Sequence, residues 1–123
     1  MNIKIDKADK IFSQYIRTRD RKCMRCSSPV KFNDAGMPIS HQNSHYFGRG
    51  KESTRFDQEN CDTLCHGCHR IWGSDDREAY RVFKIKQLGE NGFNALVLRA
   101  NKTVKKDRKL SLIIVTELLK EVK

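Results

Sequence analysis

The chain has 123 residues, with 25 Lys and Arg against 15 Asp and Glu, a formal net charge of +10 and 37% hydrophobic residues. This length fits one compact domain and excludes barrels and doubly wound sheets, which need a longer chain. A core this small is expected to need an additional stabilising element, and a bound metal ion is the obvious candidate.

No run of about 18 apolar residues occurs, so no segment is expected to span a membrane. The start of the chain lacks the apolar central region of a secretory signal. We therefore expect a cytoplasmic protein. In a reducing compartment, closely spaced cysteines hold metal ions more often than they form disulfides, and the odd count of five Cys favours the same interpretation.

The positive charge is concentrated at the two ends of the chain. Residues 1–22 carry seven Lys and Arg against three Asp and Glu, and residues 99–123 carry eight against three, whereas residues 23–98 carry ten against nine. Basic side chains that neutralise phosphates release condensed counterions, so these flanks favour a nucleic-acid partner. A solvated basic surface that only aids solubility is the alternative.

The first predicted element is a helix over residues 6–19, with Asp6 as its N-cap. A hairpin is predicted over residues 30–47, with turn residues at 33–36, followed by a surface loop at 48–53 that can approach a phosphate. A second short extended piece is predicted at residues 61–64.

The C-terminal third is predicted to be helical. A helix opens at Asp75 and Asp76 and stops at Gly89, a short helical segment covers residues 92–100, and a last helix covers residues 104–122. One face of the last helix is apolar and either covers the core or supplies the contact of a homodimer. That face consists of Leu110, Ile113, Ile114, Leu118 and Val122.

Four of the five cysteines form a strong metal-binding pattern. Cys23 and Cys26 make one C-x2-C pair, Cys65 and Cys68 make another, and 38 residues separate the pairs. Each two-residue gap lets one tight turn present two thiolates to the same tetrahedral Zn²⁺, and four protein ligands leave no open position. We predict a structural Zn²⁺ site, with disulfides or unligated thiols as the alternative. Cys61 is expected to be a small buried hydrophobic residue.

The histidines are then free for other chemistry. His45 lies on the extended segment between the cysteine pairs, Asn60 precedes the second pair, and His69 follows it directly. This order, with the run NCDTLCHGCH at residues 60–69, resembles the HNH endonucleases, whose ββα-metal site lies between a hairpin and the helix that follows. The resemblance implies an HNH-type DNA endonuclease in which His69 occupies the position of a metal ligand.

A closer resemblance covers residues 11–122. The runs IRTRDR at 16–21, SHY at 44–46, RFD at 55–57, YR at 80–81 and LGE at 88–90, with the basic C-terminal helix, are similar to the phage NinG family, also called Rap. The resemblance implies a phage-encoded recombination endonuclease, acting in the bacterial host cell, that cuts branched DNA such as D-loops and Holliday junctions.

Phosphodiester hydrolysis requires a base for the attacking water, a divalent ion for the developing charge, and basic groups for the backbone. His45 is the predicted base, because a neutral imidazole takes up a proton near physiological pH. Asn60 is counted with His45 and His69 among the predicted catalytic residues, and its expected role is to hold the loop by hydrogen bonds. Many HNH sites carry an acidic ligand just before the base, whereas this chain has Ser44. Asn43 or His41 is then the substitute ligand, and a Mg²⁺ or Mn²⁺ ion would be held largely by water and the DNA phosphate.

The basic residues expected to contact the DNA backbone fall into three groups. The N-terminal group is Arg17, Arg19, Arg21 and Lys22, the C-terminal group is Lys105, Lys106, Arg108 and Lys109, and the loop group is Arg49, Lys51 and Arg55. For the loop group, ordinary solvated charges are an equally good interpretation.

The sequence thus predicts a single α+β domain over residues 1–123. A small zinc-stapled, HNH-like ββα-metal (treble-clef-like) core at 23–73 is flanked by a basic N-terminal helix at 1–22 and by C-terminal helices at 74–123. The predicted activity is metal-dependent, structure-selective cutting of branched DNA in phage recombination. Two alternatives are a non-catalytic zinc-containing DNA-binding module and a small phage regulator that binds duplex DNA.

Overall fold

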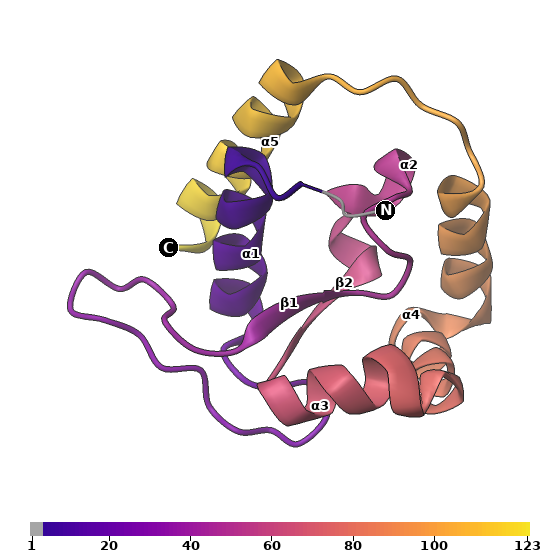
Figure 1. Cartoon of the computed structure of the whole chain (residues 1–123), viewed down its shortest axis with the longest axis horizontal. Helices are drawn as coiled ribbons and strands as arrows, with labels where there is room; N and C mark the ends of the chain where they lie inside the picture. Colours follow the sequence, from indigo (N-terminus) through magenta and orange to yellow (C-terminus); the bar gives the residue numbers. More distant parts are fainter. Residues whose placement is uncertain (1–3) are drawn as a thin grey trace.

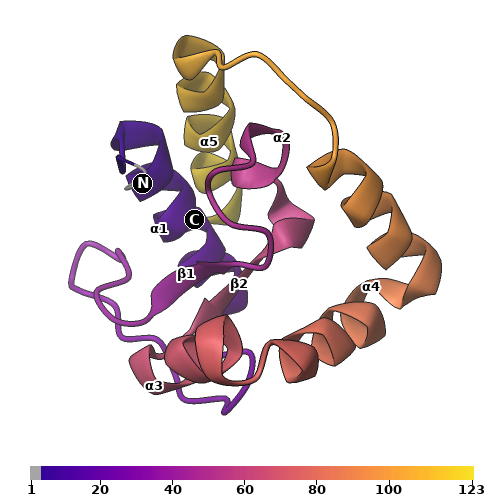
Figure 2. The same cartoon turned by 45° about the vertical axis from the view of Figure 1, so that its right-hand side comes forward.

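The computed structural model describes residues 4–123, so the first three residues of the predicted N-terminal segment lie outside the described part. At the centre of the molecule, strands β1 (Gln42–His45) and β2 (Cys61–Leu64) form a two-stranded antiparallel sheet in which Ser44 pairs with Asp62 and His45 with Cys61. Figures 1 and 2 show helices α1 and α5 on one side of this sheet and α3 and α4 around the other. The predicted α+β class is confirmed.

Helix α1 (Lys7–Asp20) begins with a complete capping box. The Asp6 side chain accepts the Asp9 N–H, and the Asp9 side chain accepts the Asp6 N–H, so two of the unpaired donors at the helix start are satisfied. The buried face of α1 packs on β2 and on α5 (Arg108–Val122), which runs alongside it (Figure 1). This first core cluster includes Phe12, Ile16, Cys61 and Val115.

A second core cluster lies on the other side of the sheet. Helix α3 (His66–Arg70) continues into a π-helical turn, η2 (Ile71–Asp75), which leads to α4 (Arg77–Ala100) with Asp76 as its N-cap. Aromatic rings form most of this cluster, with Trp72 stacked on Tyr80 at a centroid distance of 4.9 Å. The predicted stop at Gly89 is a break inside α4, where a φ of 77° interrupts the helical backbone.

The segment between the two cysteine pairs is less regular than the predicted hairpin. The turn at residues 33–36 forms, but only an isolated bridge between Phe32 and Pro38 closes it. The regular strand pairing is instead between β1 and β2, which are joined through a short helix α2 (Glu52–Arg55) and a 3-10 turn η1 (Gln58–Asn60).

The last helix begins four residues later than predicted, with Asp107 as its N-cap. Its apolar residues divide between two surfaces. Val115 is buried, and Leu118 and Val122 pack against α1, whereas Leu110, Ile113 and Ile114 are about half exposed. Of the apolar face predicted for the last helix, the C-terminal part therefore covers the core and the N-terminal part is exposed. Within residues 4–123, no helix combines the length and hydropathy needed to cross a membrane.

Candidate metal centre and active site

The four cysteines of the two C-x2-C pairs come together in the folded chain. The sulfur atoms of Cys23, Cys26, Cys65 and Cys68 all lie within 4.8 Å of one another, and the Cys26 and Cys65 sulfurs are 3.8 Å apart. In a tetrahedral site with Zn–S bonds of about 2.3 Å, the sulfurs are about 3.8 Å apart. A disulfide would need about 2 Å, and all five cysteines are free. The cluster therefore fits a structural zinc ion.

Backbone contacts hold both cysteine pairs in place. The Cys23 N–H donates to the Ser28 carbonyl, and the Met24 N–H donates to Thr63 on β2, so the first turn is docked on the sheet. Cys65 is the N-cap of α3 and Cys68 lies within that helix. A hydrogen bond with the Ser28 hydroxyl is the main cause that lowers the pKa of Cys26 to about 6, which favours the thiolate that binds metal.

Cys61, the first residue of β2, is fully buried in the core cluster that it forms with residues of α1 and α5, outside the metal-binding cluster, as predicted. Burial raises the pKa of its thiol well above the ordinary value, so it is held as a neutral apolar group.

His45, the predicted base, is the last residue of β1. Its Nε2 is 2.9 Å from the Arg55 carbonyl oxygen, which can only accept, so Nε2 carries the proton and Nδ1 is the free lone pair. Nδ1 is buried and has no partner within the described residues. Burial, followed by the charge of Arg49, lowers the pKa of His45 to about 4, so the imidazole is neutral at pH 7 but is a weaker base than the unperturbed ring expected from the sequence.

His45 and His69 line one cavity of about 570 Å³, between β1 and α3. His69 lies on the same helix as Cys68 and is half-buried, and burial lowers its pKa. Two arginines that the sequence analysis did not single out, Arg70 and Arg77, also line this cavity. Arg70 directly follows His69 in the chain, which is the one signal that the sequence offered for it.

Asn60 has no exposed surface and all its polar atoms are paired. Its Nδ2 donates to the carbonyls of Phe47 and Thr54, and its Oδ1 accepts the Phe47 N–H, at 2.8 to 3.0 Å. It therefore ties both ends of the loop between β1 and α2 to η1. It does not line the cavity that contains His45.

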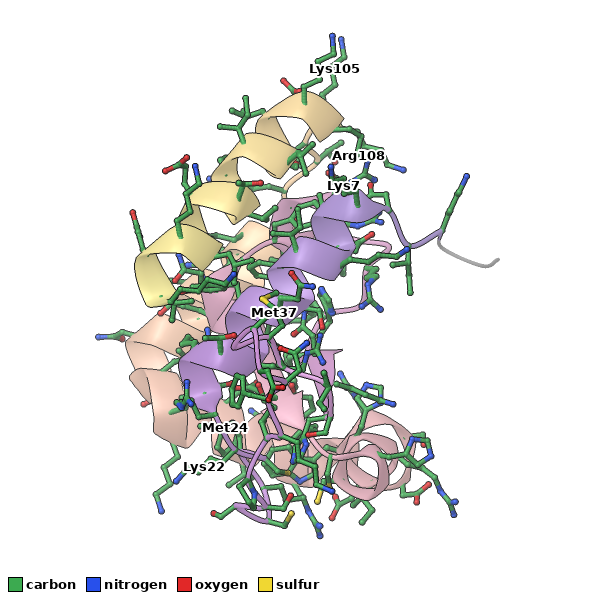
Figure 3. The ribbon with its side chains drawn as sticks, turned by 90° about the vertical axis from the view of Figure 1, so that its left-hand side faces the viewer. Lys7, Lys22, Met24, Met37, Lys105 and Arg108 are labelled. Atoms are coloured by element: carbon green, nitrogen blue, oxygen red, sulfur yellow. The ribbon has the colours of Figure 1, made fainter. Side chains whose placement is uncertain are left out.

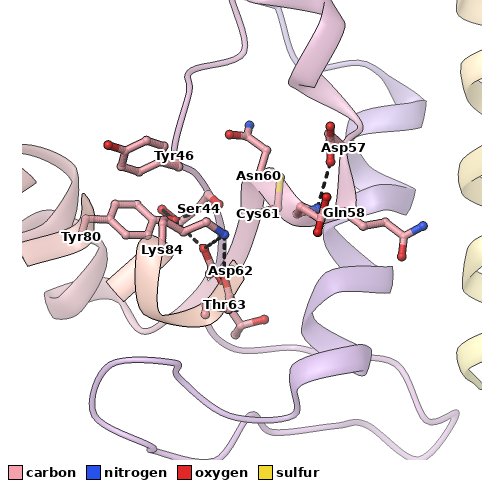
Figure 4. A network of polar contacts seen from close by, with 12 residues as sticks. Ser44, Tyr46, Asp57, Gln58, Asn60, Cys61, Asp62, Thr63, Tyr80 and Lys84 are labelled. Atoms are coloured by element: carbon pink, nitrogen blue, oxygen red, sulfur yellow. Dashed lines mark hydrogen bonds and ion pairs between the residues drawn. The ribbon is translucent and has the colours of Figure 1, made fainter. Parts of the chain in front are cut away.

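Ser44 lines the same cavity as His45 and His69, but its hydroxyl bonds into a buried polar network shown in Figure 4. The Tyr80 hydroxyl lies 3.2 Å from the Ser44 hydroxyl and donates to Asp62 at 2.9 Å, and the Lys84 ammonium donates to the same carboxylate at 3.1 Å. Asp62 and Lys84 are both fully buried. Because its hydroxyl bonds into this network, Ser44 is part of the joint between β1 and α4 and is a poor metal ligand.

The two substitute ligands considered for Ser44 differ in their surroundings. Both ring nitrogens of His41 are engaged, Nε2 with Ser28 and Nδ1 with the Ser40 hydroxyl, so His41 braces the first cysteine turn. Asn43 is buried and both amide atoms lack a partner within the described residues. Among those residues, the four cysteines are the one group of three or more His, Cys, Asp or Glu side chains placed to hold an ion.

Arg55 does not fit the predicted DNA contact. Its guanidinium is 2% exposed and makes a two-pronged ion pair with Asp9, with Nε 2.9 Å from Oδ1 and a second bond from Nη2 to Oδ2. The residues next to Arg55 in the sequence do not indicate this ion pair, because Asp9 lies 46 residues earlier in the chain. Arg55 is therefore corrected from a phosphate ligand to a buried ion-pair partner.

Other predicted DNA-contact arginines are also engaged within the chain. Arg17 donates to the carbonyls of Ser13, Pro38 and Ser40. Arg19 pairs with Asp20 and donates to backbone carbonyls of Gln58 and Cys61.

Arg108 pairs with Asp6 and Glu52, and the Arg21 guanidinium lies 4.3 Å from the centre of the Phe32 ring. The lysines among the predicted contacts are exposed to solvent. These are Lys22, Lys51, Lys105, Lys106 and Lys109. Figure 3 shows Lys105 and Arg108 at the end of the molecule where α1 and α5 begin, and Lys22 at the opposite end. Lys22 of the N-terminal basic group therefore does not form one patch with the C-terminal basic group.

Replacement of Cys65 by Ser is expected to abolish zinc binding and cooperative thermal unfolding, because loss of a thiolate ligand removes metal-coupled folding free energy. Zinc per chain and a calorimetric melt measure this. The matched control is Cys61→Ala, which should keep one zinc and lose about 1 kcal/mol for the missing buried atom. Full zinc occupancy with a cooperative melt in Cys65→Ser would contradict the assignment.

The environment of His45 predicts an unusual titration. Its pKa in the folded chain is about 4, against 6.5 ordinarily, so the unfolded state binds a proton first as the pH falls. The contribution of His45 to stability is therefore complete above about pH 6.5 and is lost as the pH falls towards 4. NMR of the imidazole ring measures the midpoint, and a value near 6.5 in the folded protein would show that the ring is not desolvated.

The chain is similar to a known protein family. The family model described as Bacteriophage Lambda NinG protein matches residues 2–122, and neither the curated proteins nor the solved structures gave a match. The match covers nearly the whole chain and confirms the family resemblance. The chain belongs to the NinG family of bacteriophage proteins.

Proposed function

We propose that the protein is an HNH-type, metal-dependent DNA endonuclease that hydrolyses phosphodiester bonds in branched recombination intermediates of phage DNA. The single observation that carries this proposal is the state of His45. A neutral ring whose Nε2–H is fixed on a carbonyl and whose Nδ1 lone pair is unpaired is a base in the right tautomer. Family membership supports the phage recombination context.

The cavity shared by His45 and His69 offers the remaining groups that hydrolysis needs. His45 Nδ1 accepts the proton of the attacking water. Arg70 and Arg77 supply positive charge to the phosphate, and Arg77 is held by a bond to the Tyr46 carbonyl at 2.7 Å. Strand β1, strand β2 and helix α3 follow one another along the chain with only short helical turns between the strands, and β1 and α3 line this cavity, which supports an HNH-like ββα arrangement.

A divalent ion, Mg²⁺ or Mn²⁺, would stabilise the charge on the phosphate and the leaving oxygen. His66 and His69 both line this cavity from α3, the helix that the cysteine cluster anchors, and we propose the more buried of the two, His69, as the protein ligand. No Asp or Glu of residues 4–123 lines the cavity. The ion is therefore expected to bind mainly through water and the DNA phosphate, and only when DNA is present.

The alternative is a non-catalytic zinc-containing DNA-binding module or a small phage regulator. The burial of Ser44 in the Tyr80 network and the absence of a cavity carboxylate in the described chain favour this alternative. Binding without cutting, or preference for a linear duplex over a four-way junction, would support it.

Replacement of His45 by Ala is expected to slow cutting of a four-way junction or D-loop by at least about 100-fold and to leave DNA binding unchanged, because a base acts on the barrier and not on the bound state. Gel assays with Mg²⁺ or Mn²⁺, with a linear duplex for comparison, measure the rate. The comparison variant is His66→Ala, which removes an exposed histidine that lines the same cavity and should cut at a rate near that of the wild type. Wild-type cutting by His45→Ala would refute the base assignment.

The exposed lysines just before α5 and in its first turn are expected to supply affinity and not chemistry. Replacing Lys105, Lys106 and Lys109 by Gln should weaken binding to junction and linear DNA alike, and lower the slope of log K against log salt by about 0.9 for each phosphate that is no longer neutralised. Anisotropy titrations at several salt concentrations measure this. The control is Lys86→Gln, an exposed lysine on α4. An unchanged slope in the triple variant would place the DNA elsewhere.

A further inference from the structure

A second cavity of about 330 Å³ lies on the α1 side of strand β1 and is separate from the predicted catalytic residues except for His69, which borders both. Arg17 of α1, Asn43 of β1 and Arg49 of the following loop line it. Asn43 and His45 are two residues apart on the same strand, so their side chains emerge on the same face of the sheet. The second cavity therefore adjoins the first along β1.

Asn43 is the most unusual group in this cavity. The residue is 6% exposed, yet its Oδ1 and Nδ2 make no hydrogen bond to any of residues 4–123. A buried amide without partners costs free energy, and such groups are rare in folded proteins. The cost is recovered if a ligand supplies the missing partner.

The charges around Asn43 define which ligand fits. Arg17 donates through Nε and Nη1 to three carbonyls and has no carboxylate within ion-pair distance in the described chain. Arg49 shares Asp9 with Arg55, at 3.8 Å, and its buried Nε has no hydrogen-bond partner there. No Asp or Glu of the described residues lines the cavity. Two guanidinium groups without a full counter-charge favour an anion as the ligand.

We propose that this second cavity binds a phosphate group of the DNA backbone next to the bond that is cut, with the Asn43 amide N–H and the guanidinium groups of Arg17 and Arg49 as its donors. The assignment rests on the proposed nuclease function, since DNA is the source of the phosphate. It makes Asn43 a substrate-positioning residue. The subsite would fix the register of the strand while His45 acts on the neighbouring phosphate.

Asn43→Ala separates this role from a structural one. The amide has no partner to lose, so the melting temperature should stay the same or rise, whereas a structural hydrogen bond would lower it. DNA binding without divalent ions should weaken by roughly tenfold, the value of one hydrogen bond to a charged group. Asn43→Asp should weaken binding further, because a carboxylate occupies the place of the phosphate. The control Asn91→Asp makes the same charge change at an exposed position of α4 and should bind as the wild type does.

A second measurement tests the cavity without DNA. Inorganic phosphate, added to the zinc-loaded full chain at constant ionic strength, should shift the NMR signals of the Asn43 side-chain amide, and chloride should not. The absence of a shift overturns the phosphate site, even in a protein that cuts DNA. A shift, combined with wild-type DNA binding by Asn43→Ala, overturns the assignment to the DNA backbone in favour of free phosphate. A wild-type protein that binds no DNA contradicts the proposed function, and the DNA assignment with it, whatever the phosphate titration gives.

Discussion

Four cysteine sulfurs within 4.8 Å of one another place the turn at Cys23 against the start of α3, and a zinc ion bound to them would close a loop of 38 residues. The loop itself contains little regular secondary structure. The sheet has two short strands, and the core divides into two small clusters on either side of that sheet. Metal binding would therefore add to the free energy of folding of the whole chain, and would also order the cysteine cluster itself. Because Cys65 is the N-cap of α3, the same closure places His69 beside β1.

The orientation of His45 depends on a second chain of contacts that starts in α1. The carboxylate of Asp9 both completes the helix cap and holds the Arg55 guanidinium. Arg55 in turn presents its carbonyl to His45 Nε2, while Asn60 ties the intervening loop at both ends. The buried ion pair between Asp9 and Arg55 thus links the start of α1 to the carbonyl contact that fixes the tautomer of His45 on β1. Its value lies in this geometry, because the net stability gained from a buried ion pair is small once desolvation is subtracted.

The parts of this arrangement that the sequence could predict are those set by local rules. Asp6 and Asp76 marked helix starts, Gly89 marked a break, and the two C-x2-C pairs identified the metal cluster, because each depends on residues only a few positions apart. The burial of Arg55 could not be predicted in this way, since nothing near Arg55 indicates a partner as distant as Asp9. The same holds for α5, where the packing of α1 decides which apolar residues are covered and leaves Ile113 exposed.

The charge of +10 acquires a more specific meaning once each basic side chain has a place. Arginines at 17, 19, 55 and 108 donate to carbonyls and carboxylates of the chain, a use that suits a planar group with five donors. The lysines at 22, 51, 105, 106 and 109 remain in solvent. Much of the arginine charge is therefore used in contacts within the fold, and the long-range attraction for a polyanion rests mainly on the lysines. A substitution of Arg by Lys inside the fold would keep the net charge and still disturb the site, because the ammonium cannot reproduce the two-pronged bond that Arg55 makes with Asp9.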